Sequence, residues 1–391
     1  MGSATLTTGG NDASTLFSGN ATGSGDLIKE GTGTMTFSGN NTFSGELEIT
    51  EGTASLGADN AFSDSMDLRF NGGTFATDGF ADAMDNLIVD SNSTLDFLSA
   101  SGGFLTFDDA TRNGGTLTID NWVGELGGNG DTRLQVTASS LGGSLIDNIT
   151  FTGWGDAQLI NLGGGLYEVV PDTSGFFEWD SGSGNQNWDS GVNPPWVGNN
   201  APPDNTAGTQ VLFGDAIANG SESITLNGDR TVGTMVINAT GNRDYSFSAD
   251  GTPTSFRELT FNSTSGDANL TVLGEAEHFI GRSSGGYTDV LAEDDLNIIN
   301  NSSGATGLTL GEVGGDDYLR TGGNSITFRG GGTTEVNSEI REGGDLIKEG
   351  TGTLRLANGA SDFTGGVTLN SGQLQLGDSG VLGSGSLTIN G

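Results

Sequence analysis

The sequence predicts an all-β protein that folds as a parallel β-helix, an elongated β-solenoid that divides into two stacked modules. Short segments of alternating apolar and polar residues occur along the whole chain, and none shows the three-and-four spacing of an amphipathic helix. The segment Gly25–Thr34 also returns letter for letter as Gly344–Thr353, 319 positions later. A repeated unit of this kind predicts a fold built by stacking.

The predicted strands are short and end at Gly, Asn, Asp or Ser, which supply tight corners. The clearest are Thr34–Phe37, Glu46–Ile49, Thr116–Ile119, Arg133–Val136, Ser223–Leu226, Thr234–Ile237, Ser325–Phe328, Gly366–Leu369 and Gln373–Leu376. A β-sandwich would show longer strands and hairpin turns of fixed type. Frequent corners instead favour a parallel β-helix with about 20 residues per coil.

The likeness between the two copies continues beyond the ten identical residues, over 25–57 and 344–377. The positions that define it are Leu27, Lys29, Gly31, Gly33, Phe43 and Gly45 in the first copy, and Leu346, Lys348, Gly350, Gly352, Phe363 and Gly365 in the second. The distance between the copies predicts modules of about 319 residues, so the chain covers slightly more than one period.

The positions of the two copies divide the chain into three predicted regions. Residues 1–172 are predicted to be the C-terminal part of one β-solenoid module, and residues 216–391 a second module. The stretch 173–215 between them holds three of the five tryptophans and four of the six prolines, and is predicted to be a junction or cap. The chain is expected to be a piece of a longer protein, with its export signal and anchor outside it.

The charge excludes several partners. Lys and Arg total 13 against 50 Asp and Glu, which gives a net charge of −37. Such a field repels nucleic acid and anionic membrane surfaces, so neither is an expected partner. No run approaches the roughly twenty apolar residues of a membrane-spanning helix. The absence of cysteine excludes disulfides and thiolate metal sites.

Candidates for catalysis are few. Asp108 and Asp109 with Arg112 form the best paired-carboxylate motif for acid–base chemistry. A solvated corner explains them better in a chain with 50 acidic residues. His278 has no motif around it and is predicted to be a surface residue. No catalytic, metal-ligating or cofactor-binding residue is therefore assigned, and the sequence does not predict an enzyme.

Calcium ions and sugars are two further candidate ligands. The acidic segments Glu293–Asp295, Asp316–Asp317 and Gly127–Asp131 predict at most weak, non-specific Ca²⁺ binding. Trp179, Trp188 and Trp196 are candidates for stacking on sugar rings, but cap or junction packing is the stronger interpretation.

The repeat resembles the autotransporter-associated β-strand repeat (passenger-associated repeat) family of large bacterial surface proteins. The matching residues run from Leu27 to Phe37 and from Leu346 to Leu356, each followed by Phe-x-Gly at Phe43 and Phe363. The resemblance implies a β-helical segment that lies outside the cell or on its surface. It predicts a non-enzymatic structural role within an adhesin-like fibre.

Two alternatives stay open from the sequence. In the first, the chain self-assembles into an extracellular filament, joined head to tail through open β-helix ends. In the second, the β-helix binds or cleaves a polysaccharide in a groove lined by Asp108, Asp109 and Arg112 or by the tryptophans. The expected partners are therefore further modules of the same chain, other copies of it, or a surface polysaccharide.

Overall fold

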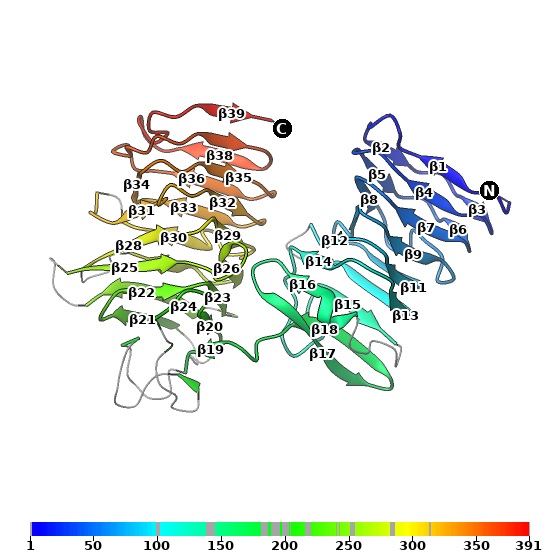
Figure 1. The fold of residues 1–391 in the computed structure, drawn as a ribbon, viewed down its shortest axis with the longest axis horizontal. Coiled ribbons are helices and arrows are strands. Elements are labelled where there is room, and N and C mark those ends of the chain that lie inside the picture. The colour runs from blue at the N-terminus through cyan, green and yellow to red at the C-terminus, as the bar shows by residue number, and fades with distance from the viewer. Residues whose placement is uncertain are drawn as a thin grey trace. The chain divides into compact units, whose positions relative to one another are not determined.

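The computed structural model describes residues 2–98, 102–137, 145–180, 187–188, 196–197, 203, 205–215, 220–239, 241, 243–250, 255–281, 286–312 and 314–390 (Figure 1). Within these ranges the regular structure is β-strand apart from one short 3₁₀ helix, η1 (Ile146–Asn148). The chain divides into two compact units, Met1–Asp172 (unit 1) and Thr173–Gly391 (unit 2), and each is described by itself. No helix among the described residues has the length and apolarity needed to cross a membrane.

Unit 1 is built from two parallel stacks of strands. Sheet 1A contains β1 (Leu6–Thr8), β4 (Leu27–Lys29), β7 (Glu46–Ile49), β9 (Asp67–Phe70), β11 (Ala81–Val89), β13 (Phe104–Arg112) and β15 (Arg133–Val136). Sheet 1B contains β2 (Thr15–Phe17), β5 (Thr34–Phe37), β8 (Thr53–Leu56), β10 (Thr74–Ala76), β12 (Ser93–Asp96), β14 (Leu117–Asp120) and β16 (Ile149–Phe151). The short strands β3 (Thr22–Gly23) and β6 (Thr42–Phe43) pair at a corner.

An antiparallel hairpin closes the C-terminal end of unit 1. It consists of β17 (Gly155–Gly163) and β18 (Leu166–Pro171). Strand β18 pairs with β15 of sheet 1A, and β17 pairs with β16 of sheet 1B, both antiparallel. The hairpin therefore covers the last strand edge of both sheets, which removes the unpaired backbone groups that an open edge presents.

Residue alternation explains the core of unit 1. Leu47 lies opposite Leu68, and Ile49 lies opposite Phe70, and all four side chains are fully buried. Each inward residue thus stacks on its equivalent one coil away, as a period of two requires. At a corner, the buried Asn41 donates from Nδ2 to the carbonyl of the next coil, which gives the hydrogen-bonded corner expected of asparagine.

Unit 2 has three parallel stacks (Figure 1). Sheet 2A contains β19 (Phe177–Glu178), β20 (Gln210–Phe213), β23 (Thr234–Ala239), β26 (Ala268–Gly274), β29 (Leu296–Asn300), β32 (Ile326–Arg329), β35 (Leu346–Lys348), β37 (Val367–Leu369) and β39 (Leu387–Ile389). Sheet 2B contains β21 (Gly220–Leu226), β24 (Arg243–Ala249), β27 (His278–Ile280), β30 (Leu308–Leu310), β33 (Thr333–Val336), β36 (Thr353–Leu356) and β38 (Gln373–Leu376). Sheet 2C contains β22 (Arg230–Val232), β25 (Phe256–Phe261), β28 (Tyr287–Ala292), β31 (Tyr318–Arg320) and β34 (Glu339–Arg341).

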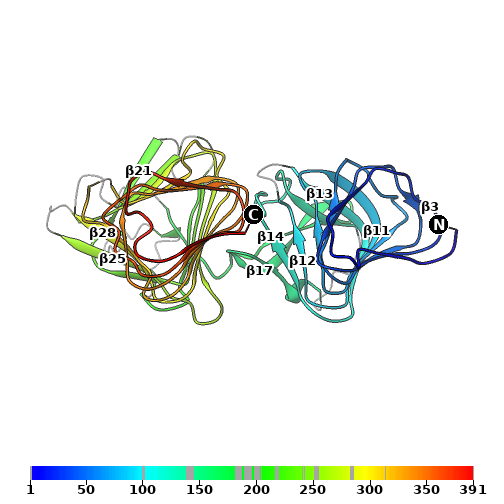
Figure 2. The same ribbon diagram turned by 90° about the horizontal axis from the view of Figure 1, so that it is seen from above.

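The view in Figure 2 looks down the stacked coils of unit 2, whose strands overlie one another around a common interior. The parallel β-helix predicted from the sequence is therefore confirmed, and each of the nine predicted strand segments lies in or overlaps an observed strand. The predicted coil length of about 20 residues is right for the repeats, where Leu27 pairs with Leu47. It is wrong elsewhere in unit 2, where Thr234 pairs with Asn269, 35 residues later.

Candidate functional site

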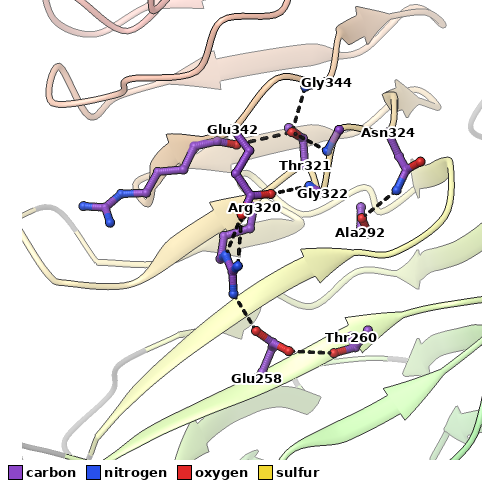
Figure 3. Close-up of polar contacts among 11 residues, drawn as sticks. Glu258, Thr260, Ala292, Arg320, Thr321, Gly322, Asn324, Glu342 and Gly344 are labelled. Atoms are coloured by element: carbon purple, nitrogen blue, oxygen red, sulfur yellow. Dashed lines mark hydrogen bonds and ion pairs between the residues drawn. The ribbon is translucent and has the colours of Figure 1, made fainter.

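The outer face of sheet 2C carries a polar network centred on Arg320 (Figure 3). Its guanidinium donates from Nη1 to Glu258 Oε2 at 2.7 Å and from Nε to Glu342 Oε1 at 3.0 Å. Glu258 lies on β25 and Arg320 on β31, so the pair spans the intervening strand β28, a separation of about 10 Å between the outer strands. All three side chains are about a third exposed, so these ion pairs shape the surface more than they stabilise it.

Glu342 is held in an unusual backbone conformation at this network. Its φ of 79° lies in the left-handed region, which costs energy for a residue other than glycine. The second carboxylate oxygen, Oε2, accepts the backbone N–H of Gly322. Beside it the buried Thr321 accepts the N–H of Gly344 at Oγ1, at 2.9 Å. The turn after β34 is thus fixed by contacts from the preceding coil.

Two depressions flank Arg320. One of about 650 Å³ is lined by Asp289, Tyr318, Arg320, Arg341, Glu342 and Asp362. The other, of about 670 Å³, shares Arg320 and Glu342 with the first. We call this combined surface the Arg320 groove. Its carboxylates outnumber its guanidinium groups, so the groove suits a neutral ligand better than an anion.

Aromatic rings lie on the same sheet face. The Arg341 guanidinium lies 3.5 Å from the centroid of the Tyr318 ring, a cation–π contact. On the two strands before, Phe256 stacks on Tyr287 with ring centroids 5.0 Å apart, and Phe256 is 51% exposed. Asp289 lies on the same strand as Tyr287, and burial raises the pKa of its carboxyl group to about 6. Ring faces beside hydrogen-bonding carboxyl and guanidinium groups are the chemistry that sugar recognition uses.

The sequence did not indicate the Arg320 groove. Its residues come from three strands of sheet 2C, β28, β31 and β34, and from the turns beside them, so only the observed register brings them together. The one available signal is an aromatic or charged residue at the outward positions of successive strands, as in Tyr318-Leu-Arg320 and Glu339-Ile-Arg341.

The three residues of the candidate acid–base motif lie on a single strand. Asp108, Asp109 and Arg112 all lie on β13, where the alternation of burial shifts by one residue between Phe107 and Ala110. Asp108 and Arg112 are four residues apart on that strand, roughly 13 Å. Arg112 donates from Nε to the carbonyl of Gly115, in the turn after β13, at 2.7 Å, and Asp109 Oδ1 accepts the N–H of Ala110. These contacts are those of a strand corner.

Trp179, Trp188 and Trp196 form an aromatic cluster at the N-terminal end of the unit 2 core. Their exposed fractions are 0–1%, so no face of the rings is open to a sugar in this structure. The Trp196 ring lies 5.2 Å from Trp179 and 5.3 Å from Trp188, and all three contact Phe213 of β20. Trp179 also donates from Nε1 to Glu222 at 3.1 Å. Large rings thus fill the first coil of the unit.

The repeat lysines lie inside the solenoid. Lys29 is 1% exposed, and its Nζ donates to the carbonyls of Glu30 at 2.9 Å, Gly31 at 2.7 Å and Glu51 at 3.2 Å. Lys348 is 3% exposed, and its Nζ donates to the two carbonyls that follow it, at Glu349 and Gly350. Burial lowers the pKa of both amines, and that of Lys348 falls to about 8.

Glycine completes this lysine corner. A Cβ built on Gly52 would meet the Gly31 carbonyl oxygen at 2.3 Å and Lys29 Nζ at 2.9 Å. Gly372 stands in the same relation to Lys348, also at 2.9 Å. Both glycines have a positive φ, 65° and 76°. The repeated Lys and Gly therefore form one structural device, the lysine corner, which satisfies carbonyls at the turn between sheets.

The prediction that His278 is a surface residue is wrong. It was expected at the surface, but it is 1% exposed and lies inside unit 2 on β27. Its Nδ1 accepts the backbone N–H of Tyr245 at 3.1 Å, and burial lowers its pKa to about 4. The expectation failed because a lone histidine carries no periodic signal of its own; its inward position follows from the strand His278-Phe-Ile280, in which Ile280 is also buried.

The acidic segments considered for Ca²⁺ bond mainly to backbone. Asp317 is fully buried and accepts the N–H of Thr288 at 2.9 Å, and Asp295 accepts the N–H of Ser325 at 2.8 Å. In the segment 127–131, Asn129 donates its N–H to Glu168. Among the described residues no group of three or more His, Cys, Asp or Glu side chains is placed to hold a metal ion.

The fold is an all-β solenoid, and its two repeated segments carry the lysine corners. A sequence model of the passenger-associated-transport-repeat family matches residues 27–53 and 346–376, the two segments that carry the corners. The chain therefore contains two copies of this repeat, and the predicted resemblance is confirmed.

A curated relative extends the match over nearly the whole chain. The chain is 26% identical over 441 residues to the protein named Adhesin BmaC autotransporter from Brucella suis biovar 1 (strain 1330). The alignment covers 96% of this chain and 12% of that protein. No solved structure matches the chain. The repeat and this relative confirm the predicted extracellular or cell-surface location.

Proposed function

We propose that the chain is a non-enzymatic spacer within an adhesin-like bacterial surface protein. Its β-solenoid units would hold other segments of that protein away from the cell. The observation that carries this proposal is the direction of the repeat residues. Leu27, Lys29 and Phe43, and likewise Leu346, Lys348 and Phe363, are 0–3% exposed. The repeat thus supplies the core and corners of the solenoid and leaves its defining side chains with no outward role.

The relative named an adhesin supports this proposal, since the chain aligns along 96% of its length with part of that protein. The charge supports it as well. A net charge of −37 keeps an extended surface soluble and unattached to anionic cell envelopes.

A spacer can be tested by display. The chain would be expressed on a cell with a surface polysaccharide, between an anchor and a small module of known ligand. Insertion of the chain is expected to restore capture of ligand-coated beads, which the module fused directly to the anchor cannot reach. A flexible glycine–serine linker of about 20 residues is the control, because its r.m.s. end-to-end distance of roughly 25 Å is shorter than the nine stacked strands of sheet 2A. Equal capture by all three proteins would contradict the spacer role.

The non-enzymatic part of the proposal has its own test. Incubation of the purified chain with a panel of bacterial and host polysaccharides is expected to release no reducing ends above the buffer control. Release that is abolished by Asp289→Asn would assign the chain a hydrolytic activity instead, since Asp289 has a pKa of about 6 and faces the Arg320 groove.

A second candidate function is binding of a neutral polysaccharide in the Arg320 groove. The exposed ring of Phe256 and the polar depressions beside it favour this candidate. On a glycan array, Phe256→Ala and Tyr318→Ala are each expected to weaken any binding about 5- to 30-fold, since a sugar–ring contact is worth about 1–2 kcal/mol. Leu16→Ala removes another exposed apolar side chain, one that belongs to unit 1, and should change nothing. Binding that survives all three variants would exclude the groove.

A further inference from the structure

The Arg320 groove carries more negative than positive charge. Its walls contain four carboxylates, Asp289, Glu293, Glu342 and Asp362, and two guanidinium groups, Arg320 and Arg341. Outside the two depressions, Glu258 and Glu339 add further carboxylates that pair with these guanidinium groups. A ligand in the groove therefore meets an excess of negative charge, which favours a cationic group on the ligand.

Both guanidinium groups of the groove are engaged by glutamates. Figure 3 shows Arg320 between Glu258 and Glu342, with nitrogen–oxygen distances of 2.7 Å and 2.9 Å. On the next strand, Arg341 Nη2 lies 2.7 Å from Glu339 Oε2. Each arginine is thus committed to a carboxylate of the protein, and little positive charge is left for an anionic ligand.

Asp289 and Asp362 line the same depression and form no ion pair with the described residues. Asp289 Oδ1 accepts the backbone N–H of Tyr318 at 3.0 Å, which leaves Oδ2 for a ligand. Asp362 is exposed in the following coil, where its own N–H donates to the Ile340 carbonyl of β34 at 3.1 Å. Carboxylates without a cationic partner, in a groove of the same sign, favour an ammonium group as ligand.

An aromatic pair lies one step along β28 from Asp289. Tyr287 is two residues before Asp289 and therefore on the same face of the strand, about 7 Å away. Phe256, on the neighbouring strand, stacks on Tyr287 and is 51% exposed. A sugar ring presents a flat face of C–H groups to such a ring, with its amino or hydroxyl groups at the edge. A ring face beside a carboxylate therefore favours a sugar polymer over a basic peptide.

The backbone at Glu342 is a separate indication that the groove is specialised for a ligand. Its φ of 79° is strained for glutamate, and the other described non-glycine residues with a positive φ are Asn or Asp, apart from Leu98. Strain of this kind is retained mainly at functional sites. Here it accompanies a carboxylate that contacts Arg320 and the Gly322 N–H, at the boundary that the two depressions share.

We propose that the Arg320 groove binds a polysaccharide of hexosamine units in which some amino groups are free, with a protonated amine held by Asp289 and Asp362. A neighbouring sugar ring packs on Phe256, and the rest of the polymer is neutral. N-acetylation of the bound amine removes its charge and two of its donors, so an acetylated unit binds more weakly at this position. This inference rests on the polysaccharide-binding candidate proposed above and names the class of its ligand.

Calorimetric titration of the full chain with two hexosamine oligomers tests the ligand class. The oligomers have the same length and linkage, and one is fully N-acetylated while the other is fully de-N-acetylated. The parent chain is expected to bind the de-N-acetylated oligomer about tenfold or more tighter, because its amines form charge-assisted hydrogen bonds. The double variant Asp289→Asn, Asp362→Asn is expected to lose this preference. Asp362→Asn alone should weaken the preference, and it changes an exposed side chain, so the fold is kept.

The matched control is the double variant Asp108→Asn, Asp109→Asn on β13 of unit 1. It should keep the full preference, because both double variants change the net charge of −37 equally and only one alters the groove. Equal binding of the two oligomers by the parent chain would overturn the amine inference and leave the polysaccharide candidate standing, whereas binding of neither would remove both. The inference is also overturned if the preference survives in the groove variant, if it is lost in the control, or if a lysine oligomer of equal charge binds the groove more tightly.

Discussion

Replacing Trp196 with alanine is expected to lower the free energy of unfolding of unit 2 by about 3–5 kcal/mol. The Trp196 ring is 1% exposed and packs edge-on against Trp179, Trp188 and Phe213. Its Nε1 also donates to the Trp188 carbonyl at 3.0 Å. The substitution removes that bond and leaves a cavity among three aromatic rings at the end of the core, where few neighbours can move in to fill it.

Calorimetry of the full chain is the measurement, with unit 1 as an internal reference. Trp196→Ala should lower one thermal transition and leave the other in place. The matched variant Trp122→Ala, at a buried ring in unit 1 that contacts Trp154 and Phe151, should lower the other transition. If each variant shifted both transitions, the two units would unfold as one cooperative body, and the tryptophan cluster would not be local to unit 2.

Many strands could be predicted from the sequence because the alternation of apolar and polar residues shows which side chains point inward. In Glu46–Ile49 the alternating Leu and Ile give the inward face directly, and the structure buries both. Sheet 2C could not be predicted in this way. Two of its strands, Tyr318–Arg320 and Glu339–Arg341, have three residues and a single buried one, which is too short a pattern to separate from a loop.

The lysine corner could be predicted from the sequence only in part. The pattern Leu27-x-Lys29 places the amine on the same face as a buried leucine, so the inward direction of Lys29 was available from the alternation alone. The full set of hydrogen-bond acceptors of Lys29 could not be predicted, because one of them, the Glu51 carbonyl, comes from the next coil. For the Arg320 groove, the outward direction of the side chains could not be predicted either. Glu258 and Arg320 are 62 residues apart, and the sequence does not reveal the two coil lengths that separate them.

Replacing a repeat lysine with methionine is expected to destabilise its own unit by roughly 2–4 kcal/mol, from the cost of leaving two or three buried carbonyls without a donor. Methionine keeps most of the side-chain volume, so packing changes little. Lys29→Met should lower the unit 1 transition, and Lys348→Met the unit 2 transition. Because the two corners have the same design, each variant serves as the control for the other.

The pH dependence separates the hydrogen bonds from the charge. Burial lowers the pKa of Lys348 from its usual 10.5 to about 8, so the unfolded chain binds more protons than the folded one between these values. The cost of burying the ammonium is therefore present below pH 8 and is relieved as the pH rises toward 10.5. A neutral amine still donates to both carbonyls, so the stability lost in Lys348→Met should be larger at pH 10 than at pH 7. A methionine variant more stable than the parent at both pH values would show that desolvation of the amine outweighs its bonds, and the lysine corner would then not be a stabilising device.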